Sequence, residues 1–373
     1  MKKIPLTKPY IPPEVKDRVL QVLDSGYLTE GLVTKEFENS VKDYIGCEHA
    51  LAVSNCTVGL EIALRTLGIG QGDEVIVPDY TYPATAAVVG IVGATIVLVD
   101  VDPETMLIDY RAIEAAVTER TKVIIPVSLF GNPLDYDRLG NMKKKYNLYL
   151  IEDAACAIGA QYDGDFVGNL ADISVFSFHP RKFITTGEGG MITTNNSGWA
   201  AWMESYKHFG MSSASPRSEI HFERIGTNYK LSDVHAAIGL VQMRQIASLL
   251  EKRTQLANRY NELLSNQPNV SIPKITPKGI HSWQSFCIFT PNRDQVIQKL
   301  AAINIETQIG TYALHMHHAY SRNPNCRIFG DLSGSQYAFD SCLTLPLYQD
   351  MTPDQQEFVA KELLHLIHEK QNK

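Results

Sequence analysis

The chain has 373 residues, of which 44% are hydrophobic and 20% are charged. This balance is typical of globular proteins and excludes disorder, collagen-like repeats and coiled coils, and the length accommodates two domains, or one large domain with an appendage. Lys and Arg number 34 against 41 Asp and Glu, so the net charge of -7 lacks the basic excess of a nucleic-acid binder.

The six cysteines are scattered, with neither a Cys-x-x-Cys pair nor a zinc-type spacing, which favours reduced and mostly buried thiols in a cytoplasmic protein. The N-terminal run MKKIPLTKPYIPPE has no apolar segment behind its lysines, so we expect no signal peptide. Residues 80–99 are uncharged and long enough to span a membrane. Because they contain Pro83, Gly90 and Gly93, we interpret them instead as a short helix, a turn and a buried strand, and we expect no membrane partner.

Short β-branched runs recur through the first half of the chain, and helical patterns such as VGLEIALRTLG and RAIEAAV separate several of them. The runs are LAVSN at Leu51, EVIVPD at Glu74, TIVLVD at Thr95, KVIIPV at Lys122, LYLIED at Leu148, ISVFSF at Ile173 and MITTN at Met191. Strands buried on both faces and alternating with helices predict an α/β domain with a mostly parallel, seven-stranded sheet between helices. Ligands of such sheets bind beyond the carboxyl ends of the strands.

After Met191 the pattern changes. Residues 231–264 have a helical pattern that we interpret as a link between two domains. The rest mixes a strand, WQSFCIF from Trp283, with helices from Arg293 and at the C-terminus, PDQQEFVAKELLHLI. We therefore predict a large domain over 1–247 and a smaller C-terminal α+β domain over 248–373.

Lys182 lies in SFHPRKFITTGEGGM, just past a predicted buried strand and before three glycines. Desolvation lowers the pKa of an amine, which gives the free-base nucleophile that Schiff-base chemistry requires. A loop lysine in water is the ordinary alternative for any single lysine. The neighbouring motifs must therefore decide between the two.

Each neighbouring candidate has a functional and an ordinary interpretation. Asp153 closes a strand, so its carboxylate could pair with a protonated pyridine nitrogen or act as a turn residue. Thr57 opens a helix, where its hydroxyl and the amides of Thr57 and Val58 form an anion site or an ordinary N-cap. Ser177 could supply another hydroxyl to the same anion. Tyr82 could stack on an aromatic ring or be a core tyrosine.

Taken together, the runs SNCT, PDYTYPAT, IEDAA, SFHPRK and TTGEGG occur in an order that resembles the DegT-type family of nucleotide-sugar aminotransferases. The resemblance covers nearly the whole chain and includes SGYLTEG, GQGDEVIVP, GTNYKLSDVHAAIGLVQM and LPLYQDMT. The most specific block is 151–191. The resemblance implies pyridoxal 5′-phosphate (PLP) as the cofactor and the PLP transferase fold type I of aspartate aminotransferase for the large domain.

On matching positions the resemblance implies that Lys182 forms the internal aldimine, that Asp153 pairs with the pyridinium nitrogen and that Tyr82 stacks on the ring. It implies that Asn228 reaches the phosphate in a neighbouring subunit, which would make the enzyme a homodimer with shared active sites. The same phosphate would be held by Ser177, Thr57 and the Val58 amide.

The resemblance also implies substrate contacts, for which the candidates are Thr29, Glu188, Tyr312 and His315. The chain departs from the family's common pattern at Cys156, where Gln or His usually contacts the cofactor and a thiol donates only weakly. Ser128 replaces a frequent histidine, which bears on sugar recognition, and IGTYALHMHHAY replaces a HYPIPLH-like run. We expect no metal site, since no carboxylate stands at useful spacing from His317 and His318.

The implied reaction is ping-pong transfer of an amino group from L-glutamate to a nucleotide-linked keto sugar, in deoxyamino sugar and polysaccharide biosynthesis. HPRKFITTGEGG resembles the C4-aminating branch of the family, which implies a 4-keto-6-deoxyhexose as acceptor. A C3-aminating enzyme stays open. Two further alternatives are a sugar dehydratase, whose relatives have histidine in place of Lys182, and a non-enzymatic regulator, which would not require the intact set of site residues.

Overall fold

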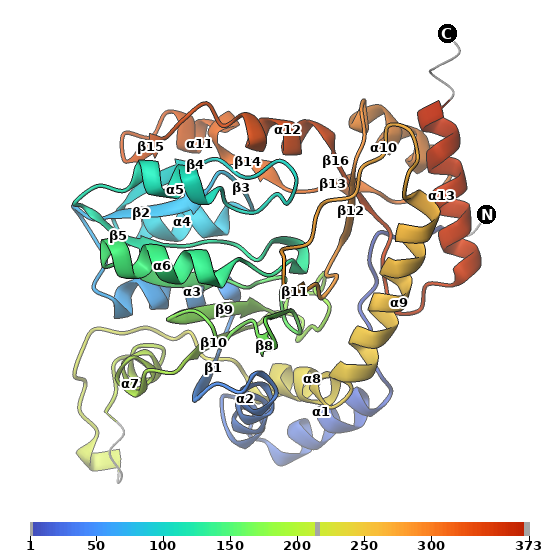
Figure 1. Cartoon of the computed structure of the whole chain (residues 1–373). Helices are drawn as coiled ribbons and strands as arrows, with labels where there is room; N and C mark the ends of the chain where they lie inside the picture. Colours follow the sequence, from blue (N-terminus) through green and yellow to red (C-terminus); the bar gives the residue numbers. More distant parts are fainter. Residues whose placement is uncertain (1–2, 213–216, 369–373) are drawn as a thin grey trace.

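A mixed sheet of eight strands forms the centre of the larger part of the molecule in this computed structural model, which describes residues 3–212 and 217–368 (Figure 1). Strands β1 and β10 pair antiparallel at one edge, as do β10 and β9, and the other neighbours are parallel. In spatial order the strands are β1 (His49–Val53), β10 (Gly190–Thr194), β9 (Ile173–Ser177), β6 (Tyr149–Asp153), β5 (Thr121–Ile124), β2 (Glu74–Pro78), β4 (Thr95–Val99) and β15 (Cys326–Ile328).

The predicted fold class is confirmed, because all seven β-branched runs belong to this sheet and the sheet is mostly parallel. The eighth strand, β15, comes from a part of the chain where the sequence indicated no strand. It has three residues, CRI, and none is fully buried, so it lacks the apolar run that identified the others.

Helices cover both faces of the sheet, and this explains why residues on both faces of its central strands are buried. Alternate residues of one strand enter different cores: Ile76 joins one core, and Val75 and Val77 join the other. The first core includes residues of α2 (Leu32–Ile45), α5 (Tyr110–Ala116), α6 (Tyr136–Tyr146) and α8 (Asp233–Met243). The second includes residues of α3 (Cys56–Thr66), α4 (Ala84–Ile91) and α7 (Ser197–Tyr206).

The uncharged stretch 80–99 has the predicted form of helix, turn and buried strand. It begins with β3 (Tyr80–Thr81), continues through α4 and the turn at Gly93, and ends in β4. Within residues 3–212 and 217–368, no helix combines the length and the apolar character needed to cross a membrane.

The predicted helical region 231–264 consists of two helices that run in different directions, α8 and α9 (Ile246–Leu264) (Figure 1). Helix α8 is buried on most sides and packs on α1 (Glu14–Ser25) and α2, whereas α9 leads away to a third apolar core. Around this core lie a three-stranded sheet and two helices, namely β12 (Phe286–Phe289), β16 (Cys342–Leu345), β13 (Gln308–Ile309), α10 (Arg293–Ala302) and α13 (Pro353–His368).

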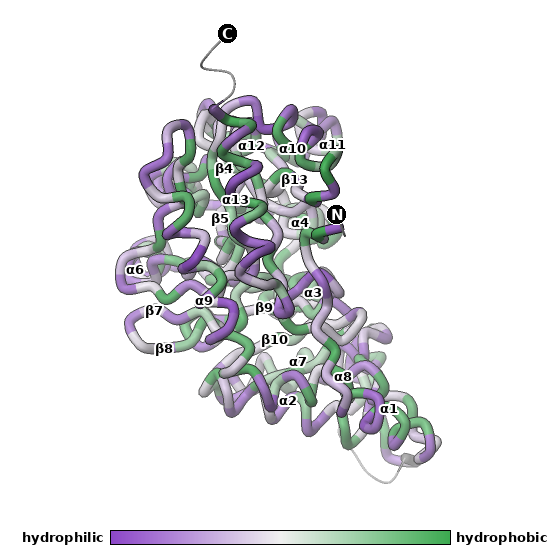
Figure 2. The backbone as a smooth tube through the Cα atoms, turned by 90° about the vertical axis from the view of Figure 1, so that its right-hand side faces the viewer, coloured by the Kyte–Doolittle hydropathy of each residue, from purple (hydrophilic) through white to green (hydrophobic). Residues whose placement is uncertain are grey.

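The N-terminal segment lies against this third core. The Ile4 amide donates to the Asn304 carbonyl at 2.9 Å, and the Leu347 amide donates to the Leu6 carbonyl at 3.0 Å. In Figure 2, hydrophobic residues are frequent along the central strands, whereas hydrophilic and hydrophobic stretches alternate along α13 at the surface. The division of the chain into 1–247 and 248–373 stays a prediction.

Short elements complete the described fold. They are β7 (Gln161–Tyr162), β8 (Asp165–Phe166), β11 (Gly279–Ile280), β14 (Tyr312–Ala313), α11 (His318–Ser321), α12 (Ser333–Ser341) and the 3-10 turns Leu129–Gly131, Arg217–Glu219 and Leu314–Met316. Strand β14 pairs antiparallel with β3, with Tyr312 opposite Thr81. This pairing brings the segment around residue 312 to the carboxyl-end edge of the large sheet.

Candidate active site

A cavity of about 1130 Å³ lies at the carboxyl ends of the parallel strands, between the large sheet and the small one. Asp153 and Ser177, at the ends of β6 and β9, line it on the side of the large sheet, and residues 308–309 and 344–345 line it on the side of the small sheet. This is the position at which ligands of open α/β sheets bind. Nine of the predicted site residues line the cavity: Thr57, Val58, Tyr82, Asp153, Cys156, Ser177, Lys182, Glu188 and Tyr312.

Lys182 points its amine at the cysteine that departs from the family pattern, since Lys182 Nζ donates to Cys156 Sγ at 3.0 Å. Burial disfavours the ammonium form, but the proximity of Cys156, Cys56 and Asp153 favours it more, so the pKa of Lys182 is raised. Desolvation does lower this pKa, as the sequence argument states, but the neighbouring groups outweigh it, so the net shift in the protein alone is upward. A free amine requires a partner in the cavity that displaces the thiol contact.

The loop around Lys182 is fixed by Gln284, which no sequence motif indicated. Gln284 Oε1 accepts the Phe183 amide at 2.7 Å, and its Nε2 donates to the Arg181 carbonyl at 2.8 Å. Arg253 of α9 in turn donates to the Gln284 carbonyl at 2.9 Å. The residues on both sides of Lys182 are thus bonded to one side chain about a hundred positions away in sequence.

Asp153 is 5% exposed, and its carboxylate is fixed from two sides. Thr85 Oγ1 donates to its Oδ2 at 2.7 Å, and the Ala155 amide donates to its Oδ1 at 3.1 Å. Burial raises the pKa of Asp153, against the opposing effects of these two bonds and of Lys182. A buried carboxylate in such a position is stabilised by a cationic group placed against it from the cavity.

The helix start expected to bind an anion is present, but its N-cap is Asn55 and not Thr57. Helix α3 begins at Cys56, and Asn55 Oδ1 accepts the Val58 amide at 3.0 Å. The Val58 amide therefore already has a partner, which the sequence interpretation missed although Asn is among the preferred N-cap residues. The Thr57 and Ser177 hydroxyls remain candidates for an anion, since both residues line the cavity.

Tyr82 is not a core tyrosine, because it is 66% exposed and lines the cavity. Its ring lies 6.4 Å from the Tyr312 ring, with an angle of 54° between the planes. Glu188 lines the cavity nearby, with a carboxylate oxygen 3.9 Å from His179 Nε2. Tyr82, Tyr312 and Glu188 are therefore available to a ligand in the cavity.

Two predicted substrate residues and one family departure lie outside the cavity lining. His315 is bound to Asp79, with 2.6 Å between its Nδ1 and Asp79 Oδ2, and this bond raises the pKa of His315. Thr29 does not line the cavity, and its carbonyl accepts the Asp233 amide at 3.3 Å. Ser128 is fully buried and donates to Glu152, so it does not face the cavity.

Asn228 also lies outside the cavity lining of its own chain. Its Oδ1 accepts Lys230 Nζ at 2.8 Å, on the segment between the 3-10 turn Arg217–Glu219 and α8. No group of three or more His, Cys, Asp or Glu suited to a metal ion occurs in the described part of the chain.

Residues 9–364 match the model of the DegT/DnrJ/EryC1/StrS aminotransferase family. The chain belongs to this family. It is 39% identical over 326 residues to the GDP-perosamine synthase of Caulobacter vibrioides, covering 86% of this chain and 87% of that one. An uncharacterized protein of Methanocaldococcus jannaschii is 35% identical over 364 residues, or 94% of each chain.

Solved structures of the family agree closely with this fold. DesV of S. venezuelae in complex with a ketimine intermediate superposes with a TM-score of 0.92 at 29% identity, covering 99% of both chains. A putative sugar aminotransferase of Streptococcus pneumoniae in its PLP form gives 0.91 at 29% identity, covering 98% of this chain and 99% of that one. The expected family, enzyme class and fold are thereby confirmed, and so is PLP as the cofactor of this family.

The residues of this cavity fit PLP. A buried carboxylate suits a protonated ring nitrogen, a lysine amine in the same cavity suits the aldehyde carbon, and two hydroxyls beside a helix start suit the phosphate. These groups are Asp153, Lys182, Thr57 and Ser177.

Proposed function

We propose that this aminotransferase uses PLP to move an amino group from L-glutamate to a nucleotide-linked keto sugar, specifically a 4-keto-6-deoxyhexose. One observation supports this above all: Lys182, in the loop after β9, and the buried Asp153, at the end of the neighbouring β6, line the same cavity. The similarity to a GDP-perosamine synthase supports a nucleotide sugar as the acceptor.

When bound, PLP supplies an electron sink for the electron pair released at the reacting carbon. Lys182 would hold the cofactor through its amine, and the same amine would act as general base and general acid at the reacting carbon of the substrate. Asp153 would keep the ring nitrogen protonated, and Tyr82 would contact the ring.

The phosphate would be held by Thr57 and Ser177 from one subunit and by Asn228 from the neighbouring one. In support of this, Asn228 lies outside the cavity lining of its own chain and its amide group stays accessible beside Lys230. The enzyme would then be a homodimer with two shared active sites, since a two-fold axis gives each subunit both roles.

The C4 position of amination rests on the run HPRKFITTGEGG, and C3 amination is the second candidate. Lys182 argues against the dehydratase, whose relatives have histidine at this position. The complete set of Lys182, Asp153, Thr57 and Ser177 around one cavity argues against a regulator without activity.

The first test is an absorbance spectrum of the purified protein with PLP, recorded before and after excess L-glutamate. We expect a yellow band that bleaches with glutamate, and borohydride should fix the cofactor to the peptide that contains Lys182. A yellow band unmoved by glutamate would point to another donor. Label on another lysine, or the absence of any band, would overturn the proposed site.

The second test is a screen of nucleotide-linked 3-keto and 4-keto sugars against the aminated enzyme. Return of the yellow band reports transfer of the amino group, and we expect it with a 4-keto-6-deoxyhexose. Return only with 3-keto sugars would establish the C3-aminating alternative.

A further inference from the structure

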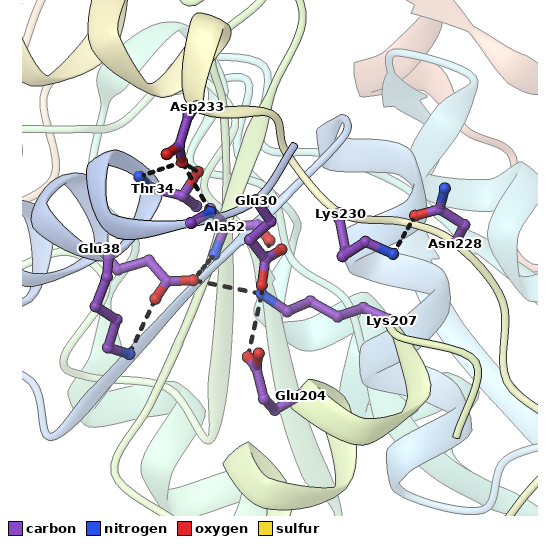
Figure 3. A network of polar contacts seen from close by, with 11 residues as sticks. Glu30, Thr34, Glu38, Ala52, Glu204, Lys207, Asn228, Lys230 and Asp233 are labelled. Carbon is purple, nitrogen blue, oxygen red and sulfur yellow. Dashed lines mark hydrogen bonds and ion pairs between the residues drawn. The ribbon is translucent and has the colours of Figure 1, made fainter. Parts of the chain in front are cut away.

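Lys207 is a buried lysine at the centre of an ion cluster whose residues do not line the cavity (Figure 3). Its side chain is 1% exposed, and Nζ lies 3.2 Å from Glu30, 3.4 Å from Glu38 and 3.1 Å from Glu204. The same Nζ donates to the Ala52 carbonyl, at the end of β1, at 3.2 Å. We define Lys207, Glu30, Glu38 and Glu204 as the Lys207 cluster.

The main chain at Lys207 is bonded to the segment that contains Asn228. The Tyr229 amide donates to the Lys207 carbonyl, and the Thr227 amide donates to the Tyr206 carbonyl, each at 3.0 Å. These bonds lie on both sides of Asn228. The position of Asn228 therefore follows the position of Lys207.

The three carboxylates come from three different elements. Glu38 belongs to α2 and also accepts the Ala52 amide at 2.8 Å, while Glu204 belongs to α7. Glu30 lies in the loop before α2, where the neighbouring Gly31 amide is fixed by Asp233 at 2.8 Å. One ammonium group thus connects the Asn228 segment to this loop, to α2, to β1 and to α7.

Three carboxylates around one ammonium are a poor way to gain stability. Desolvating charges costs several kcal/mol per ion, and apolar residues of similar volume often stabilise a buried position better. Burial, together with Glu204 and Glu38, raises the pKa of Glu30 to about 7 although Lys207 opposes this. The ion pairs instead fix the position of the Lys207 side chain, because each carboxylate belongs to a different element.

We propose that Lys207 is a positioning residue, whose ion cluster holds Asn228 in the orientation needed to bind the cofactor phosphate of the neighbouring subunit. The proposal rests on the proposed function, since it takes Asn228 to act across the subunit interface. It assigns an effect on cofactor binding to a side chain that does not line the cavity.

Hybrid dimers test the proposal directly. A Lys182→Ala subunit mixed with an Asn228→Ala subunit forms one complete site, which combines the lysine of the second subunit with the asparagine of the first. We then add Lys207→Met to one subunit at a time. In the subunit that supplies Asn228, it should lower the PLP affinity of the complete site roughly tenfold or more, as loss of a hydrogen bond to a charged group does.

In the subunit that supplies Lys182, the same substitution should leave the complete site unchanged, because its own Asn228 position is already alanine. An equal loss in both placements would assign Lys207 to its own subunit's site or to general stability, and would overturn the proposal. A parent hybrid without restored activity would instead contradict the shared site itself, and with it this use of Lys207.

A titration separates the phosphate from the rest of the cofactor. In the Lys207→Met homodimer, absorbance titration should show weaker binding of PLP but unchanged binding of pyridoxal, which lacks the phosphate. Equal weakening for both would contradict the proposal. The matched control is Lys35→Met, which removes an exposed lysine from Glu38 at 3.0 Å and should change neither affinity.

If Lys207→Met does not fold, the double variant Lys207→Met/Glu30→Gln lowers the number of unpaired buried carboxylates and serves in its place. Its expected results are the same in both experiments. PLP affinity equal to that of the wild type in this variant would overturn the proposal.

Discussion

The loop of Lys182 and the segment of Asn228 are each fixed by a buried cation from elsewhere in the chain, but in different ways. Arg253 reaches the lysine loop through carbonyl oxygens and the neutral side chain of Gln284, and burial lowers the pKa of Arg253 to about 10. Lys207 holds the Asn228 segment among three carboxylates, and these raise its pKa despite its burial.

The two regions differ in how their contacts depend on pH and in which subunit's active site they serve. The Gln284 bonds are neutral, and Arg253, with a pKa of about 10, does not change its charge near neutral pH. An ion cluster changes when one of its carboxyl groups takes up a proton, which for Glu30 occurs near pH 7. The lysine loop is fixed within the subunit that uses it, whereas we propose that the Asn228 segment is fixed for the benefit of the neighbouring one.

The largest effect is expected at Asp153, which lies beside the lysine region. Asp153→Asn should retain PLP but lower turnover by about a hundredfold or more, because an amide does not hold the ring nitrogen protonated and preorganised charge is lost. Steady-state rates with glutamate and the acceptor sugar measure it. Near-normal turnover would remove Asp153 from its proposed role.

Gln284→Met should lower turnover by roughly tenfold to a hundredfold, because displacement of a reacting group by about 1 Å has effects of this size. In the hybrid dimers it should act with the opposite subunit dependence to Lys207→Met. We expect a loss when it is placed in the subunit that supplies Lys182, and no loss in the other. If Gln284→Met and Lys207→Met cause a loss in the same subunit of the hybrid dimer, the two regions do not serve different subunits.

Thr85→Val should have a moderate effect, because it removes the hydroxyl that donates to Asp153 at 2.7 Å and leaves the shape nearly unchanged. Loss of this bond raises the pKa of Asp153 further and weakens its hold on a protonated ring. We expect turnover to fall by about tenfold, with the difference from wild type growing as the pH is lowered. A pH-independent difference would contradict this explanation.

The smallest effect is expected from Glu30→Gln, in the stability of the fold. The folded pKa of Glu30, about 7, lies above its ordinary value of 4.5, so ionisation of Glu30 destabilises the fold as the pH rises from 4.5 through 7. Glu30→Gln has no ionisable group at this position, so its fold is not destabilised in this way as the pH rises. The melting temperature of Glu30→Gln minus that of wild type should therefore increase by a few degrees between pH 5 and pH 8.

A difference in melting temperature that stays constant over this range would show that Glu30 does not titrate near neutral pH in the fold. The PLP affinity of Glu30→Gln over the same pH range tests whether protonation of Glu30 affects the Lys207 cluster. If the variant binds PLP as tightly as the wild type at every pH, the protonation state of Glu30 does not affect the position of Asn228.

Much of the candidate site could be predicted because its residues follow buried strands. Asp153 and Ser177 end parallel neighbours, so their convergence at one edge is a property of any such sheet. Asn55 could also have been found, since Asn three positions before Val58 is a recognisable N-cap. The net direction of the pKa shift of Lys182 could not be predicted, because the sequence does not say which side chain its amine meets.

The sequence by itself determined the seven strands of the sheet, their burial between helices and the candidate group around Lys182, because apolar runs and strand ends are local features. Only the tertiary structure decided what fixes that group. Gln284 contacts the lysine loop across about a hundred residues, Lys207 meets Glu30 across a larger separation, and β15 joins the sheet from the distant C-terminal part. Contacts between distant segments depend on how the elements pack, and no local pattern of residues records that packing.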